Sequence, residues 1–125
     1  MTISVPSFTK EFSGRVIIIG FGSIGKATLP LIKRHLLLKE GAITIISPDA
    51  TNRSIAEGYG ATFLHGALTE NNYQSVLESL LTDKKERTFI INLSTEVSSK
   101  DLIIFAAKNN AHYIDTVVEP WPGFY

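Results

Sequence analysis

The sequence feature that most restricts the fold is a short apolar run that ends in a glycine-rich turn. Residues Arg15–Ile19 form the run, and the turn that follows reads Gly20-Phe21-Gly22-Ser23-Ile24-Gly25. A continuous β-branched run of this length is typical of a strand buried on both faces, as in a parallel sheet. Residues 23–39 then carry a broad apolar stripe at helical spacing. The chain therefore opens with a buried strand and the helix that crosses over from it.

Strand and helix patterns alternate along the rest of the chain. Four further strands are predicted at residues 42–46, 61–64, 88–93 and 112–115, with helical patterns between them. The last helix is expected to begin at Ser98-Ser99-Lys100-Asp101, which resembles a capping box. This alternation predicts an α/β fold, a doubly wound parallel sheet of the Rossmann type with five strands. The expected strand order is 3-2-1-4-5, and it reverses beside the first strand.

The spacing of the glycines suits a bound dinucleotide. Gly20 allows a tight turn off the strand, Gly22 lets the main chain approach a diphosphate, and Gly25 lets helix and strand pack closely. The free N–H groups and positive dipole end of the helix then face the phosphates. Phe21, Ser23 and Ile24 are predicted to line the same site. The open alternative is a glycine-rich turn in an α/β fold that binds another ligand.

The end of the second strand bears on the choice between NAD and NADP. An acidic residue near this position accepts hydrogen bonds from the adenosine ribose in NAD sites. Here the strand ends at Ser47, Pro48 follows, and Asp49 comes two residues later. Ser47 does not repel a 2′-phosphate and Arg53 lies near in sequence, so NADP stays possible although NAD is favoured. The alternative role of Asp49 is to stabilise the turn after the proline.

Polar side chains also follow the fourth and fifth strands, at the same edge of the predicted sheet. Asn92, Leu93 and Ser94 are predicted to lie near the nicotinamide end of the cofactor, together with Thr116. The alternative for Asn92 and Ser94 is that they satisfy backbone groups at the end of the strand.

Two carboxylates, Glu96 and Glu119, are expected on this ligand-facing edge. Together they could hold a cationic amine; the alternative is that both are solvated surface acids. His35, His65 and His112 show no metal-ligand spacing, so no metal site is predicted.

The composition argues against several other classes of function. The chain has no cysteine, which rules out disulfides, thiolate catalysis and zinc held by cysteine. Twelve basic residues balance twelve acidic ones, so a nucleic-acid partner is not expected. The N-terminus lacks the apolar core of a signal peptide, and no apolar run is long enough to cross a bilayer. We therefore expect a cytoplasmic protein without membrane contact.

Several of these segments also resemble a known family. The glycine motif is followed by Thr28-Leu29-Pro30-Leu31-Ile32, and later come Asn92-Leu93-Ser94 and the run from Tyr113 through Asp115 to Trp121. Together they resemble bacterial homospermidine synthase, a family within the wider saccharopine dehydrogenase-like group. The resemblance runs from about residue 16 to residue 125, and residues 115–121 are its distinctive part.

The resemblance implies a specific reaction. NAD would take a hydride from a polyamine such as putrescine, a second putrescine would displace the amine, and return of the hydride would complete an aminobutyl transfer. Glu96 and Glu119 match acidic positions of the family and would bind the substrate amines. The family carries an aspartate where this chain has Ser47, which keeps NADP possible as the cofactor.

The resemblance also implies a longer protein, because the family's chain continues beyond the matching part. We expect a lead-in at residues 1–14, a dinucleotide-binding domain at 15–119, and at 120–125 the start of a linker to a missing substrate and dimerisation domain. The chain would then be an incomplete fragment, inactive alone, of an enzyme that is a homodimer when complete. The aromatic residues Trp121, Phe124 and Tyr125 would contact another domain or subunit.

Two other functions stay open at this point. One is a lone regulatory module that senses a dinucleotide. The other is a piece of a saccharopine-type amino-acid dehydrogenase, against which Glu96 argues, because the carboxylate of an amino-acid substrate would favour a basic partner there.

Overall fold

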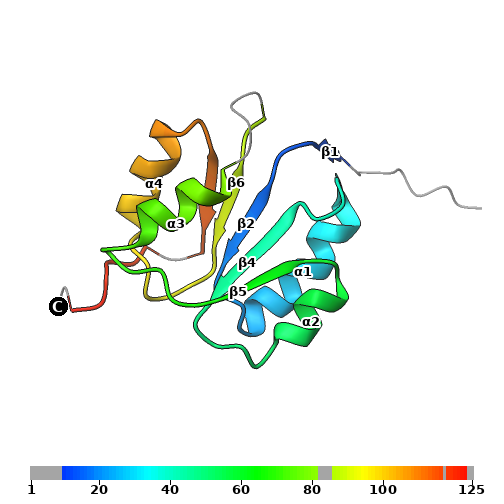
Figure 1. The fold of residues 1–125 in the computed structure, drawn as a ribbon, viewed down its shortest axis with the longest axis horizontal. Helices are drawn as coiled ribbons and strands as arrows, with labels where there is room; N and C mark the ends of the chain where they lie inside the picture. Colours follow the sequence, from blue (N-terminus) through cyan, green and yellow to red (C-terminus); the bar gives the residue numbers. More distant parts are fainter. Residues whose placement is uncertain (1–9, 82–85, 117, 124–125) are drawn as a thin grey trace, which may run out of the picture.

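The main sheet of the protein has five parallel strands in the order β5-β4-β2-β6-β7 (Figure 1). The computed structural model describes residues 10–81, 86–116 and 118–123. The strands are β2 (Val16–Ile19), β4 (Ile43–Ser47), β5 (Thr62–His65), β6 (Phe89–Asn92) and β7 (His112–Asp115). In chain order this is 3-2-1-4-5, so the predicted doubly wound sheet and its reversal beside the first strand are confirmed.

Helices cover both faces of this sheet. In Figure 1, α1 (Ser23–His35) and α2 (Arg53–Gly58) lie on one side, and α3 (Tyr73–Leu80) and α4 (Ser99–Lys108) lie on the other. Right-handed crossovers explain the division, because the strand order proceeds one way from β2 to β5 and the other way from β6 to β7.

The central strand β2 is buried on both faces, as its unbroken apolar run predicts. Ile17 and Ile19 pack into one core cluster with α3 and α4, and Val16 and Ile18 pack into a second cluster with α1. Each fully buried aliphatic side chain stabilises the fold by about 1.5–3 kcal/mol. The carboxyl end of β2, where the glycine turn begins, is therefore held firmly from both sides.

A second, two-stranded sheet was not predicted. Strands β1 (Lys10–Phe12) and β3 (Leu36–Leu38) pair in parallel, within residues expected to be lead-in and helix. The helix expected to reach residue 39 ends at His35. Leu36 and Leu38 are partly buried while Leu37 between them is 60% exposed, so these leucines follow a strand period of two.

The segment after β7 lies on helix α4. Ser99 N–H donates to the Glu119 carbonyl at 2.8 Å, and Glu119 N–H donates to Ser99 Oγ at 3.1 Å. The indole N–H of Trp121 donates to Asp101 Oδ2 at 2.7 Å, and the indole ring lies 5.3 Å from the ring of Tyr73. Residues 120–123, expected as the start of a linker, therefore pack against α3 and α4, while residues 124–125 lie outside the described part.

Candidate functional site

The glycine turn between β2 and α1 contains two glycines that the protein itself requires. Gly20 has a φ of +88°, and a Cβ there would lie 3.1 Å from the Ser94 nitrogen. A Cβ on Gly25 would lie 2.9 Å from a ring carbon of Phe21 and 3.2 Å from the Gly20 carbonyl oxygen. Side chains at these two positions would therefore push the turn away from β6 and away from the start of α1.

Gly22 is different, because the fold does not require a glycine there. Its backbone is extended, with a φ of −88° and a ψ of −150°, and apart from its chain neighbours a Cβ at this position would have no atom of the described residues within 4 Å. The space that such a Cβ would enter faces away from the described protein. A glycine at this point leaves room for a ligand to approach the main chain closely, as the glycine spacing predicts.

The N-terminus of α1 presents unused donors beside Gly22. The helix has no side-chain cap and no acidic residue in its first turn. Its first backbone bond, from Lys26 N–H to the Gly22 carbonyl, measures 3.0 Å, and the N–H groups before it have no helical acceptor. Ser23 and Ile24 are exposed at this end. The arrangement suits an anion such as a diphosphate.

The end of β4 forms a tight polar turn. Ser47 is buried, and its hydroxyl accepts a hydrogen bond from Asp49 N–H at 3.3 Å and donates to the Asp49 carbonyl at 3.1 Å. Asp49 Oδ1 accepts from both the hydroxyl and the N–H of Thr51, and these bonds lower the pKa of the Asp49 carboxyl. Asp49 thus stabilises the turn, as the alternative interpretation held, and it stays exposed and ionised at neutral pH.

Arg53 is engaged elsewhere and does not face this turn as a free cation. Its Nε donates to Glu57 Oε1 at 2.9 Å, and its guanidinium carbon lies 5.7 Å from the centre of the Phe63 ring. The pairing of Arg53 with a 2′-phosphate, which keeps NADP possible from the sequence, would compete with this exposed ion pair.

A small cleft joins the carboxyl ends of β2, β4, β5 and β6. Its volume is about 20 Å³, and it is lined by residues that include Gly20, Pro48, Gly66, Ser94 and Glu96. The structure therefore brings the glycine turn, the turn after β4 and one of the two predicted carboxylates together. The cleft is too small to enclose a dinucleotide.

Asn92 faces into the protein at the end of β6. It is 1% exposed, its Oδ1 accepts from Ser94 N–H at 3.0 Å, and its Nδ2 donates to the Tyr113 hydroxyl at 3.1 Å. This is the arrangement expected if Asn92 satisfies backbone groups. Ser94 Oγ likewise accepts from Glu96 N–H at 3.2 Å. Contact of Asn92 and Ser94 with a cofactor stays a prediction.

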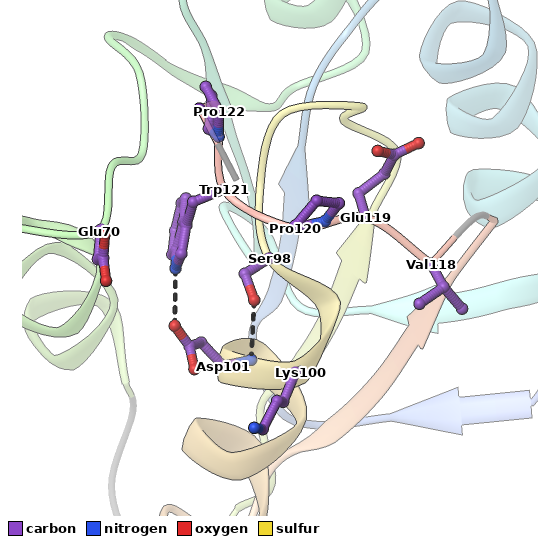
Figure 2. Close-up of a pocket in the computed structure, with 10 residues that line it drawn as sticks. Glu70, Ser98, Lys100, Asp101, Val118, Glu119, Pro120, Trp121 and Pro122 are labelled. Atoms are coloured by element: carbon purple, nitrogen blue, oxygen red, sulfur yellow. Dashed lines mark hydrogen bonds between the residues drawn. The ribbon is translucent and has the colours of Figure 1, made fainter. Parts of the chain in front are cut away.

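The structure separates Glu119 from Glu96. Glu119 lines another groove, of about 610 Å³, together with Trp121 and its neighbours (Figure 2). In Figure 2 the Glu119 side chain points away from the indole of Trp121. Leu93 and Thr116, also predicted near the nicotinamide, line a third groove beside α1. The two carboxylates therefore do not share one hollow in this part of the chain.

Two residues of this region were missed from the sequence. Asn52 Nδ2 donates to the Phe21 carbonyl at 3.1 Å and ties α2 to the glycine turn. Tyr113 links Asn92 to Asp115, whose Oδ2 accepts its hydroxyl proton at 2.9 Å. Strand alternation places Tyr113 and Asp115 on one face and could have suggested that pair, whereas nothing in the sequence pointed to the contact of Asn52.

The match to known sequences covers most of the chain. Residues 16–122 match the family described as saccharopine dehydrogenase NADP binding domain. The chain belongs to that family. This saccharopine dehydrogenase-type domain resembles two curated relatives named homospermidine synthase, from Mesorhizobium japonicum and Blastochloris viridis. Each is 46% identical over 115 residues, which cover 92% of this chain and 24% of the relative.

A solved structure gives the same result for the saccharopine dehydrogenase-type domain. The crystal structure of homospermidine synthase from Legionella pneumophila in complex with NAD superposes with a TM-score of 0.86 at 33% identity. It matches over 96% of this chain and 26% of that chain. The resemblance inferred from the sequence is confirmed, and the chain spans about a quarter of the length of these relatives. Within the described residues no helix is long and apolar enough to cross a membrane.

Proposed function

We propose that this chain is the NAD-binding part of a homospermidine synthase, which transfers an aminobutyl group between putrescine molecules. The observation that carries the proposal is Gly22, a glycine that the fold does not need, beside the uncapped start of α1. The relatives of the same name, and the NAD held by one of them, support the same conclusion. Bound NAD would accept a hydride from the polyamine and return it.

In the proposed site, the main chain holds the diphosphate. The turn from Gly20 to Gly25 places N–H groups and the positive end of the α1 dipole toward the anion. Asp49, ionised and exposed at the end of β4, would accept from the adenosine ribose through Oδ2, because only Oδ1 is used within the described residues. Its charge would repel a 2′-phosphate, and Arg53 is already paired, so we infer a preference for NAD over NADP.

Glu96 is the carboxylate best placed to bind a substrate amine. It lines the same cleft as Gly20, so it lies at the edge where the cofactor would react. Glu119 follows β7, outside that cleft, and would hold a second ammonium group only if both substrate amines extend that far. Carboxylates here favour a diamine over an amino-acid substrate, whose own carboxylate they would repel. The rest of the longer polypeptide would enclose the substrate and provide the homodimer contacts.

The test is a calorimetric titration of the chain with NAD and with NADP. We expect NAD to bind more tightly than NADP, and Gly22→Ala to weaken NAD binding at least about tenfold, which corresponds to ~1.4 kcal/mol. The melting temperature should stay unchanged, because the new methyl group meets no atom of the described residues beyond its chain neighbours. Gly58→Ala is the matched control, since its Cβ also meets open space but lies away from the cleft.

Two results would contradict the proposal. One is the absence of binding by either dinucleotide to the folded chain at millimolar concentration. The other is a Gly22→Ala chain that binds NAD as tightly as the wild type, which would mean that the space beside Gly22 is not where the cofactor lies.

A further inference from the structure

The face of β6 and β7 that looks toward α1 carries an apolar groove of about 350 Å³. We call it the β6–β7 groove; it is lined by Ile91, Leu93 and Ile114 of the sheet side, by Ile32 of α1 and by Leu36 of β3. Ile114 is 54% exposed there. The polar residues Thr28, Asp115 and Thr116 stand among these apolar ones.

The central strands of a parallel sheet are buried on both faces, as β2 is here. Strand β7 lies at an edge of the sheet, where Ile114 is exposed. On the opposite face of β7, Tyr113 packs against the core cluster that contains α4. Strand β7 is therefore covered on one face. On the other face, Phe12 of β1 packs against His112 at the start of the strand, and Ile114 stays exposed.

The crossovers of this fold explain why the face stays open. Right-handed connections place α1 and α2 over β2, β4 and β5 on one side of the sheet. They place α3 and α4 on the other side, as Figure 1 shows. No connection among the five strands therefore sets a helix over the α1 side of β6 and β7. Phe12 of β1 covers the start of this side, beside Phe89 and His112, and an element that covers Ile114 as well has to come from outside the five-stranded unit.

We propose that an amphipathic helix from outside these residues, in a longer polypeptide, docks in the β6–β7 groove. The curated relatives have room for it, because this chain matches only 24% of their length. A helix is convex and about 10–12 Å wide, so it can fill a concave groove. A second copy meeting the same face in a symmetric dimer would set groove against groove and leave the apolar residues unfilled.

The docked helix would also reach the edge where the predicted site lies. Leu93 and Thr116 stand at the carboxyl ends of β6 and β7 and line the β6–β7 groove. The helix would cover both residues and shield that edge from water. The docking itself depends only on the apolar face and its geometry, so it holds whether or not NAD is the ligand.

The test is photo-crosslinking in the whole polypeptide that the gene encodes. A p-benzoylphenylalanine replaces Ile114 in one protein and Ile103 in the control. Ile103 lies on α4 with 53% exposure, matched to the 54% of Ile114, but it does not line the groove. We expect position 114 to crosslink to one helical segment of the same polypeptide outside residues 1–125. Position 103 should reach that segment several-fold less.

Three outcomes would overturn the proposal. The first is a crosslink from position 114 to a second copy, which a mixture of light and heavy isotope-labelled chains would reveal. The second is a crosslink to a different protein. The third is a crosslinking yield at position 114 that is no higher than at position 103. As a second measurement, Ile114→Asp should speed hydrogen exchange of the docked helix several-fold, while exchange in β2 stays unchanged. Ile103→Asp should leave the exchange of that helix as it is, and equal effects of the two substitutions would also refute docking.

Discussion

At the scale of single residues, neighbouring glycines of one motif serve different purposes. Gly20 has a positive φ and lies against the backbone of Ser94, so the protein needs it. Gly22 has an ordinary φ and open space around its Cα, so the protein does not. The spacing of the glycines predicts both roles, but only the surrounding atoms show which substitution affects folding and which affects binding.

Gly20→Ala should therefore reduce the stability of the fold. A non-glycine residue at positive φ costs about 1–2 kcal/mol, and the contact of the new methyl group with Ser94 adds to this. We expect a melting temperature roughly 5–10 °C lower, measured by circular dichroism. Gly22→Ala is the control, and equal melting temperatures for the two variants would contradict this account.

The residue scale also shows where sequence reasoning stopped. Asn92 and Asp49 were each assigned a cofactor role and a structural alternative. Asn92 is buried and bonded within the protein, whereas Asp49 stabilises a turn and still exposes its carboxylate. From the sequence, both residues are known only to lie at or just after the end of a strand, so the sequence does not distinguish them. The two residues differ in burial, which depends on what packs above each strand end, and their contact with a cofactor stays a prediction.

At the scale of elements, capping and periodicity differ in how well they predict boundaries. The Ser98 cap of α4 was predicted from the sequence, and Ser98 Oγ accepts from Asp101 N–H at 3.2 Å. The end of α1 was not predicted correctly, because residues 36–38 are leucines that suit a helix or a strand equally. Pairing with β1 decides for the strand, and β1 lies more than twenty residues earlier in the chain.

Ser98→Ala tests the cap at the start of α4. The loss of the hydrogen bond to Asp101 N–H should lower the free energy of unfolding by about 1 kcal/mol. Urea denaturation followed by circular dichroism measures this value. Ser54→Ala, at an exposed position in α2, should change stability by less than about 0.5 kcal/mol. Equal free energies of unfolding for the two variants would mean that the Ser98 cap does not stabilise the fold.

At the scale of the whole molecule, a chain of hydrogen bonds joins β6 and β7 at their carboxyl ends. It runs from Ser94 N–H to Asn92, from Asn92 to Tyr113, and from Tyr113 to Asp115. Burial, followed by the effect of Asp115, raises the pKa of Tyr113 from 10.0 to about 12. The folded molecule therefore favours the neutral phenol.

This pKa predicts how stability depends on alkaline pH. Unfolded Tyr113 ionises near pH 10 and folded Tyr113 near pH 12, so its contribution is complete below pH 10 and is lost between the two values. The urea midpoint of the wild type should fall more steeply across this interval than that of Tyr113→Phe. The variant should also be about 1 kcal/mol less stable at neutral pH. Parallel curves for the two proteins would contradict the raised pKa.

The sequence alone was sufficient for the strand order, the glycine turn and the resemblance to homospermidine synthase, because these follow from local periodicity and from short motifs. Tertiary structure alone decided that Glu96 and Glu119 line different hollows, that Arg53 is paired, and that Ile114 of β7 is exposed. The physical reason is that contacts between distant segments depend on which surfaces meet after the sheet has formed. A periodic pattern specifies the face on which a side chain lies, but it does not specify what packs against that face.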